Sequence, residues 1–303
     1  MKKNQLGQSN LHVSEIGFGT MSIGTDQEMG ISLIHEAIDN GVNFIDTADL
    51  YEFGLNEEIV GKALQDRRDS VILSSKGGNH WENGKEGWFW DPSKKHIKDA
   101  CKQSLKRLKT DYLDLYQLHG GTIEDPIDET IQAFEELKQE GLIREYGISS
   151  IRPNVIREYV QRSSIASVMM QYSILDRRPE EEMLDLLHKH NISVIARGPL
   201  AKGMLTDRFE DKVKDQGFLT HSKDEVLEMA RKLSDIQGND RNMTQTALRY
   251  TLAHPAVATA IPGASKSEQL LSNLTAQNSP ELTQNEINDI QSISKAITYD
   301  KHR

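Results

Sequence analysis

The chain has 303 residues, of which 27% are charged and 37% belong to the hydrophobic set, and its formal net charge is −10. This composition is typical of a globular protein with a large core and excludes a disordered chain. The negative charge argues against nonspecific binding to nucleic acid or to an anionic membrane, because both require a basic surface.

Targeting segments and disulfides are not expected. No apolar run follows Lys2 and Lys3, so we expect no signal peptide. No apolar run approaches the roughly 20 residues that cross a bilayer. The single cysteine, Cys101, excludes an internal disulfide and a cysteine-cluster zinc site. It shares a helical spacing with Ile97 and Leu105, which predicts a buried structural thiol and fits a reducing cytoplasm.

Short apolar runs rich in β-forming residues alternate with segments of helical periodicity. The predicted strands are residues 14–18, 42–45, 71–74, 113–118, 143–148, 167–171, 192–196 and 256–261. Helix starts stand between them, at Asp26 as an N-cap and at the Pro-containing pairs and triplets near residues 92, 126, 153 and 179. Two helical stretches, 223–237 and 243–253, separate the last two strands, and a third, 284–295, follows the eighth. One of the first two is therefore an insertion.

This alternation predicts an α/β protein with parallel strands and crossover helices. Seven or eight βα units in about 260 residues fit a closed (β/α)8 TIM barrel with extra C-terminal helices better than an open doubly wound sheet. The Rossmann alternative lacks its fingerprint, because no third glycine follows Gly17 and Gly19 in register. No linker or low-complexity tract interrupts the chain, so we expect a single domain over residues 1–303.

Residues 43–51, Asn-Phe-Ile-Asp-Thr-Ala-Asp-Leu-Tyr, carry a predicted strand end into a polar turn. Asp46 lies at the strand end and Tyr51 follows five residues later. A phenol can donate a proton when its neighbours lower its pKa from about 10, so this pair can begin an acid-base site. The alternative is a capped turn in which Asp46 and Thr47 satisfy backbone N–H groups and Tyr51 packs. Asp49 is expected to be a turn residue.

Two further polar residues end the next two strands, namely Lys76 and His119. In a barrel of parallel strands the carboxyl ends of all strands face one mouth, so these residues should meet Asp46 and Tyr51 there. Such a group suits proton transfer to a carbonyl oxygen, because an ammonium lowers the pKa of a neighbouring phenol. Taken alone, Lys76 could be a solvated loop lysine and His119 a structural histidine. We see no nucleophile for acyl transfer and no His/Glu spacing that suggests a metal site.

The chain resembles the aldo-keto reductase superfamily over nearly its whole length. The matching blocks are residues 16–21, 43–51, 75–76, 104–119, 141–149, 171–173, 199–200 and 261–264. It is most similar to the bacterial branch near potassium-channel β subunits and inositol-cluster reductases. The resemblance implies a catalytic tetrad of Asp46, Tyr51, Lys76 and His119. It implies a reductase that passes hydride from NADPH to an aldehyde or ketone while Tyr51 protonates the oxygen.

The resemblance also implies contacts to the nicotinamide half of the cofactor from Gly19, Thr20, Met21, Ser149, Ser150, Gln171 and Arg197. Ser150 stands where the family has asparagine, so one hydrogen bond to the carboxamide is lost or remade through water. Arg197 replaces the aromatic residue that usually stacks on nicotinamide. A guanidinium plane can also stack on a ring, and the alternative is an arginine turned away into a salt bridge.

For the phosphate half, the implied contacts come from Gly198, Leu200, Lys202, Gly203, Gly263, Ser265, Lys266, Gln269 and Asn273. A helix N-terminus after the last strand is a natural anion site. Ser265 and Lys266 stand where related bacterial members have Lys-Arg, and one cation with one hydroxyl still favours the 2′-phosphate of NADP. Gln269 replaces a frequent arginine, which leaves NAD as a weaker alternative cofactor.

The segment 77–90 follows Lys76 and contains all three tryptophans, Trp81, Trp88 and Trp90. A glycine-rich loop with this aromatic content is expected to form a pocket wall or lid for a small carbonyl or alcohol substrate. The alternative is that the aromatic rings pack the loop onto the barrel. Two other functions stay open, a cofactor-binding regulatory subunit like the channel β subunits and a Schiff-base enzyme that uses Lys76.

Overall fold

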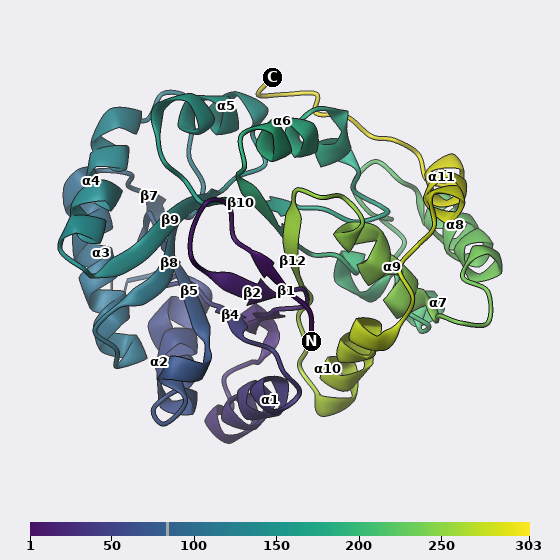
Figure 1. The fold of residues 1–303 in the computed structure, drawn as a ribbon, viewed down its shortest axis with the longest axis horizontal. Helices are drawn as coiled ribbons and strands as arrows, with labels where there is room; N and C mark the ends of the chain where they lie inside the picture. The colour runs from purple at the N-terminus through teal and green to yellow at the C-terminus, as the bar shows by residue number, and fades with distance from the viewer. Residues whose placement is uncertain (83–84) are drawn as a thin grey trace.

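The computed structural model describes residues 1–82 and 85–303. Eight parallel strands form one sheet in the order β12-β11-β10-β9-β8-β5-β4-β3, surrounded by helices (Figure 1). Bridges from Ile16 to Ala260 and from Gly19 to Gly263 join its two edges, which confirms the predicted (β/α)8 barrel. The strands are β3 (Phe18–Gly19), β4 (Phe44–Asp46), β5 (Ile72–Gly77), β8 (Leu113–Leu118), β9 (Ile143–Ser149), β10 (Ser167–Gln171), β11 (Ser193–Arg197) and β12 (Val257–Ile261).

Several helices begin at polar capping residues, among them Asp26, which was predicted as an N-cap. Asp26 accepts a hydrogen bond from the Met29 N–H at 3.0 Å, and Ser222, Asn242 and Thr283 each form a capping box. The helices are α1 (Gln27–Asp39), α2 (Leu55–Ala63), α3 (Lys94–Leu108), α4 (Ile127–Gln139), α5 (Pro153–Arg162), α6 (Met183–Lys189), α7 (Phe209–Lys212), α8 (Lys223–Ile236), α9 (Met243–Leu252), α10 (Ser267–Leu274) and α11 (Gln284–Ile293).

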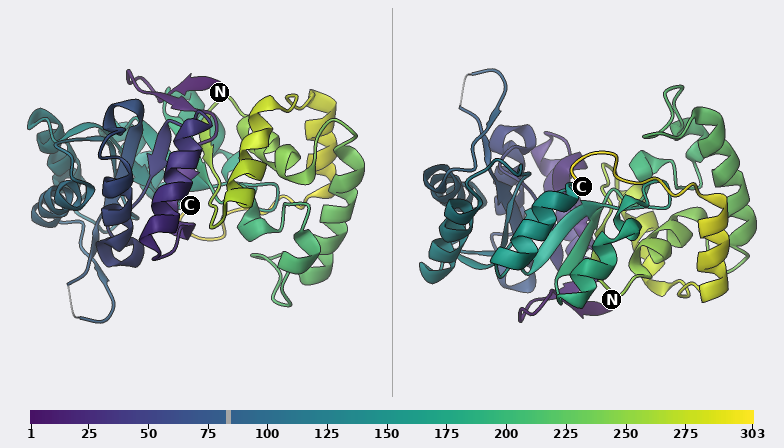
Figure 2. Two further views of the ribbon diagram at one scale, coloured as in Figure 1. Left: turned by 90° about the horizontal axis from the view of Figure 1, so that it is seen from below. Right: turned by 90° about the horizontal axis from the view of Figure 1, so that it is seen from above.

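The extra helices are α8 and α11, which pack against each other on one side of the barrel (Figure 2). The predicted helix start at residue 179 is wrong, because residues Arg178–Glu181 form a 3-10 turn and α6 begins only at Met183. On α3, Cys101 is fully buried, and burial raises the pKa of its thiol to about 12. This confirms the prediction of a buried structural thiol. In the described ranges 1–82 and 85–303, no helix is long and apolar enough to cross a membrane.

Two antiparallel hairpins were not predicted. The first pairs β1 (Lys3–Gln5) with β2 (His12–Ser14) and lies across one opening of the barrel (Figure 1). The predicted strand 14–18 is therefore divided: Ser14 belongs to β2 of this hairpin, and only Phe18 belongs to β3. The reason is packing, since Leu6, Leu11 and Val13 join the inward-facing barrel residues in one buried cluster. The second hairpin pairs β6 (Asn79–His80) with β7 (Phe89–Trp90).

A buried ion pair joins α9 to the segment before β3. Nη1 of Arg249 lies 3.1 Å from Oε2 of Glu15, and both side chains are buried. The same guanidinium donates to Oγ of Ser279 at 3.2 Å and to the Ala276 carbonyl. Replacing Arg249 would therefore leave a carboxylate and a carbonyl without their partner inside the protein.

We expect Arg249→Met to lower the free energy of unfolding by about 3–5 kcal/mol, because it leaves the Glu15 charge buried and unpaired. Urea unfolding would measure this change. The control is Arg208→Met, whose partner Asp211 is exposed, and it should change stability by less than about 1 kcal/mol. Equal effects of the two substitutions would contradict the role given to the Arg249–Glu15 pair.

Candidate active site

The four residues proposed as a tetrad meet at the carboxyl ends of three adjacent strands. Asp46 is the last residue of β4, Lys76 lies near the end of β5, and His119 follows β8. Tyr51 begins a 3-10 turn, η2 (Tyr51–Gly54), in the loop after β4. Because β4, β5 and β8 are parallel neighbours in the sheet, their polar ends converge on one mouth of the barrel.

The ammonium of Lys76 has three acceptors around it and no exposed surface. Its Nζ lies 2.6 Å from Oδ2 of Asp46, 2.8 Å from the Thr47 carbonyl and 3.3 Å from Oη of Tyr51. Burial opposes the charge, but Asp46 and Tyr51 outweigh it and raise the pKa of Lys76. A lysine held in this way keeps its proton, so the geometry disfavours a Schiff-base role.

The carboxylate of Asp46 is fixed from its other side by polar side chains inside the barrel. Oγ of Ser74 donates to Oδ1 of Asp46 at 3.0 Å, and Nε2 of Gln117 donates to Oγ of Ser74 at 2.9 Å. Sequence reasoning missed Ser74 and Gln117, which are both fully buried. The available signal was a polar residue inside a strand that is predicted to be buried.

Thr20 departs from the expected cofactor contact. It has no exposed surface, and its hydroxyl lies 2.9 Å from the Asp46 carbonyl and 2.7 Å from Oδ1 of Asn56. Oγ1 of Thr47 also donates to Oδ1 of Asn56 at 2.7 Å. Thr20 therefore supports the loop that carries Asp46 and leaves no surface for a ligand, whereas the preceding Gly19 is partly exposed and the following Met21 is 65% exposed.

His119 lies beside Tyr51 at the mouth. The two rings are 5.9 Å apart at 84°, an edge-to-face arrangement. Burial lowers the pKa of His119 to about 3, and the charges of Lys76 and Arg197 add to this effect. The imidazole is therefore neutral near pH 7. Tyr51 and His119 are partly exposed, while Asp46 and Lys76 are buried behind them.

On the opposite side of the barrel, Arg197 is held by Gln171. Nη1 of Arg197 donates to Oε1 of Gln171 at 3.0 Å, and Nε2 of Gln171 donates to Oδ2 of Asp176 at 2.8 Å. Arg178 forms two hydrogen bonds of 2.7 Å with the same carboxylate. Among the residues that the structure describes, Arg197 has no carboxylate partner within 4.0 Å, so the salt-bridge alternative does not hold.

The two serines that end the β9 region differ. Ser149 is partly exposed at the end of the strand. Ser150 is buried, and its Oγ accepts a hydrogen bond from the Arg152 N–H at 3.1 Å. The hydroxyl of Ser150 thus already accepts a hydrogen bond within its own turn. Ser149 is therefore better placed than Ser150 to contact a ligand.

The residues expected at the phosphate half lie on two adjacent loops and on α10. The loop after β11 holds Gly198, Leu200, Lys202 and Gly203. The loop after β12 holds Gly263, Ser265 and Lys266, and α10, which follows it, holds Gln269 and Asn273. Lys266 is the N-cap of α10 and is exposed together with Ser265 and Gln269. Oε1 of Gln269 accepts from the N–H and Oγ of Ser265 at 2.9 and 3.1 Å. Leu200 and Asn273 are mostly buried, so their side chains support this region from the protein interior.

The three tryptophans of segment 77–90 have different surroundings. Nε1 of Trp90 donates to Asp125 at 3.0 Å, and its ring lies so close to Gly78 that a Cβ there would be 2.8 Å away. Trp81 contacts Phe53 edge to face at 5.8 Å, and Trp88 is 54% exposed. Trp90 therefore fits the packing alternative, whereas Trp81 lies next to the turn that carries Tyr51. Residues 83–84 of this segment lie outside the described residues.

Comparison with known proteins shows the family of the chain. The model of the Aldo/keto reductase family matches residues 15–295. The chain belongs to the aldo-keto reductase family. Over 307 aligned residues that cover 100% of both chains, it is 58% identical to the Bacillus subtilis oxidoreductase YqkF. It is also 32% identical to the Escherichia coli NADH-specific methylglyoxal reductase, over 92% of this chain and 94% of that one.

A solved structure extends the comparison to the whole fold. The holo form of the aldo-keto reductase AKR11C1 from Bacillus halodurans is 55% identical, with a TM-score of 0.95 over 100% of this chain and 99% of that one. The apo form of AKR11C1 aligns with 51% identity and a TM-score of 0.86 over the same shares. The resemblance to the aldo-keto reductases is thereby confirmed.

The low pKa of His119 predicts a specific loss of stability in acid. The unfolded chain binds a proton as the pH falls through about 6.5, while the folded chain does so only near pH 3. Stability is therefore full above about pH 6.5 and falls by up to about 1.4 kcal/mol for each pH unit below it. We expect His119→Gln to remove this slope between about pH 6.5 and about pH 4.5 in urea unfolding.

The control for this titration is the exposed His12, because His12→Gln removes an imidazole without emptying a buried site. It should keep the wild-type dependence of the unfolding midpoint on pH. An unchanged slope in His119→Gln would show that the imidazole is accessible to protons in the folded protein.

Proposed function

We propose that this protein reduces an aldehyde or ketone to an alcohol with NADPH, in a reversible reaction in which Tyr51 exchanges the proton. Membership of the aldo-keto reductase family supports carbonyl reduction in general. The observation that carries the proposal is the buried Lys76 ammonium, paired with Asp46 at 2.6 Å and placed 3.3 Å from Oη of Tyr51. This arrangement places an ammonium within hydrogen-bond distance of the phenol oxygen that would give its proton to the substrate.

In this proposal each residue has one task. A bound nicotinamide supplies hydride to the carbonyl carbon. Tyr51 donates its proton to the carbonyl oxygen, and the charge of Lys76 stabilises the phenolate that remains. Asp46 keeps Lys76 charged and oriented. The neutral His119 is placed to donate a hydrogen bond to the same oxygen, because its partly exposed ring lies edge to face with Tyr51.

We assign NADPH as the preferred cofactor and NADH as the weaker one. Support comes from the exposed Lys266 and Ser265 beside the N-terminus of α10, which together suit a phosphate. The similarity to the holo form of AKR11C1, with a TM-score of 0.95, is consistent with loops already arranged for a cofactor. The relative named NADH-specific methylglyoxal reductase keeps NADH in consideration. The alternative of a regulatory subunit gains no support from these relatives.

The remaining features of the proposal concern the whole chain. We treat residues 1–303 as one domain because one sheet of eight strands holds every candidate site residue or the loop that carries it. We place the reaction in the cytoplasm because the only cysteine, Cys101, is buried and suited to a reducing compartment.

Tyr51→Phe tests the proposed role of Tyr51 as the proton donor. This variant should bind NADPH as the wild type does but reduce carbonyl substrates at least about 100-fold more slowly, the scale of general acid catalysis. A panel of aldehydes and ketones gives the rates, and the fluorescence of bound NADPH gives the affinity. Tyr112→Phe is the control, because Tyr112 precedes β8 at the other end of the barrel. Turnover near wild type in Tyr51→Phe would remove Tyr51 from this role.

Lys266→Ala tests the cofactor assignment. Loss of a charged hydrogen bond to the 2′-phosphate, worth about 1.5 kcal/mol or more, should raise the KM for NADPH roughly 10-fold. The KM for NADH should stay unchanged, since NADH has no 2′-phosphate. Lys102→Ala on α3 removes an exposed lysine far from this loop and should change neither value. Equal effects of Lys266→Ala on both cofactors would contradict the phosphate contact.

A further inference from the structure

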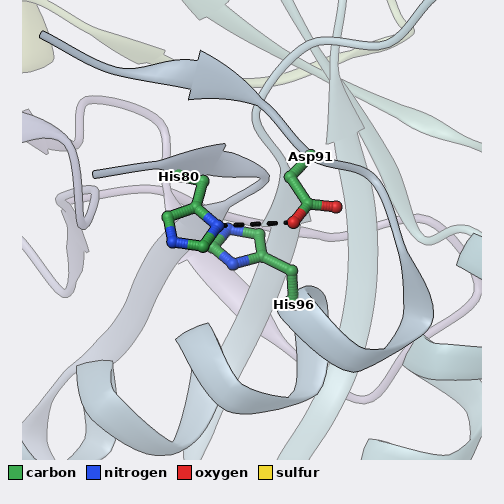
Figure 3. A group of neighbouring side chains, drawn as sticks. All are labelled: His80, Asp91 and His96. Atoms are coloured by element: carbon green, nitrogen blue, oxygen red, sulfur yellow. Dashed lines mark hydrogen bonds and ion pairs between the residues drawn. The ribbon is translucent and has the colours of Figure 1, made fainter. Parts of the chain in front are cut away.

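We propose that His80, Asp91 and His96 form a binding site for a divalent transition-metal ion such as Zn²⁺, next to the candidate active site but separate from it. The spacing of histidine and acidic residues in the sequence did not predict this site. The three residues come from β6, from the position after β7 and from the first turn of α3, and Figure 3 shows their side chains gathered in one place. One potential ligand atom from each lies within 4.8 Å of the others.

The spacing of two of these atoms already suits a metal ion. Nδ1 of His80 lies 3.3 Å from Oδ2 of Asp91. In a tetrahedral site with bonds of about 2.0–2.1 Å, neighbouring ligand atoms are about 3.3–3.4 Å apart. The His80 and His96 rings are stacked at 4.5 Å and 7°, and a potential ligand atom of His96 lies within 4.8 Å of those of His80 and Asp91.

The surrounding contacts hold the ligand side chains in place. Oδ1 of Asp91 accepts from the Ser93 N–H at 3.0 Å, which leaves Oδ2 directed at His80. Ser93 also caps α3 by accepting from the His96 N–H at 3.3 Å. Phe89 stacks on His80 at 4.6 Å. Such outer contacts are what orient ligands in metal sites.

An ion pair between His80 and Asp91 explains only part of the cluster. Nε2 of His96 is buried and has no hydrogen-bond partner within residues 1–82 and 85–303. A buried polar atom without a partner costs free energy, and a metal ion bound to it would remove that cost. All three side chains are half-buried, and they line a cavity of about 410 Å³ that gives an ion access.

The donor set selects the kind of ion. Two imidazoles and one carboxylate suit Zn²⁺, Ni²⁺ or Cu²⁺, whereas Mg²⁺ and Ca²⁺ prefer oxygen ligands. Three protein ligands leave a fourth position for water. A bound ion would tie the β6–β7 hairpin, which follows β5 and Lys76, to α3, and so would fix the loop that contains Trp81. This inference does not depend on the proposed reductase activity.

Calorimetric titration of the metal-free, untagged protein with ZnCl₂ tests the site. We expect one Zn²⁺ per chain and an affinity at least about 10-fold weaker in His96→Gln and in Asp91→Asn. The control is His254→Ala, because His254 also lies 3.3 Å from a carboxylate, that of Asp185, but outside the cluster. It should bind Zn²⁺ like the wild type. Titration with MgCl₂ should give no binding.

Two other readouts separate the site from a loss of folding. Zn²⁺ should raise the Tm of the wild type and of His254→Ala but not that of the two ligand variants. Co²⁺ should give a visible absorption band that Zn²⁺ removes. Circular dichroism of the metal-free proteins shows whether each variant is folded. The site is disproved if the folded wild type binds no Zn²⁺, or if His96→Gln and Asp91→Asn bind it as tightly as the wild type.

Discussion

The buried ion pair between Lys76 and Asp46 is the interaction on which the candidate site depends. Removing two charges from water costs several kcal/mol for each ion, and the cost is offset only when both groups have well-placed partners. Here the ammonium has Asp46, Thr47 and Tyr51, while the carboxylate also has Ser74. The barrel makes this possible because β4 and β5 are adjacent and parallel, with Asp46 opposite Ser74 and Lys76 two residues further along β5.

This ion pair places a fixed, buried charge behind the part of the mouth that a substrate can reach. Lys76 and Asp46 are buried, so a substrate can touch only Tyr51 and His119 among the four residues. The lysine also affects the histidine, because its charge, added to burial, keeps His119 neutral. A neutral imidazole donates a hydrogen bond without competing with Tyr51 as a charged acid. The two roles in the proposed reaction therefore follow from the burial of His119 together with the position of the Lys76 cation.

Features of this structure that depend on local sequence patterns could be predicted, whereas those that depend on contacts between distant parts of the chain could not. The barrel strands were predictable because apolar runs repeat along the chain, and Lys76 and His119 were predictable because polar residues end such runs. The burial of Thr20 was not, since it depends on a contact with Asn56 in α2, 36 residues further along the chain. The His80–Asp91–His96 cluster was also missed, because it is assembled by a hairpin whose strands have two residues each and show no periodicity.

Arg197 connects the proposed cofactor side of the mouth to the proton-transfer side. Its guanidinium adds to the charge that keeps His119 neutral, and it also donates to Oε1 of Gln171. Because Nε2 of Gln171 is bound to Asp176, the amide of Gln171 is engaged at both ends. A nicotinamide carboxamide can therefore gain a bond from Gln171 only by sharing or displacing one of these partners. An aromatic residue at position 197 would release Oε1 of Gln171, with Nε2 still bound to Asp176, but would remove one charge that acts on His119. On the proposed mechanism, Arg197 thus occupies Oε1 of Gln171 and adds its charge to the burial and the Lys76 charge that keep His119 neutral.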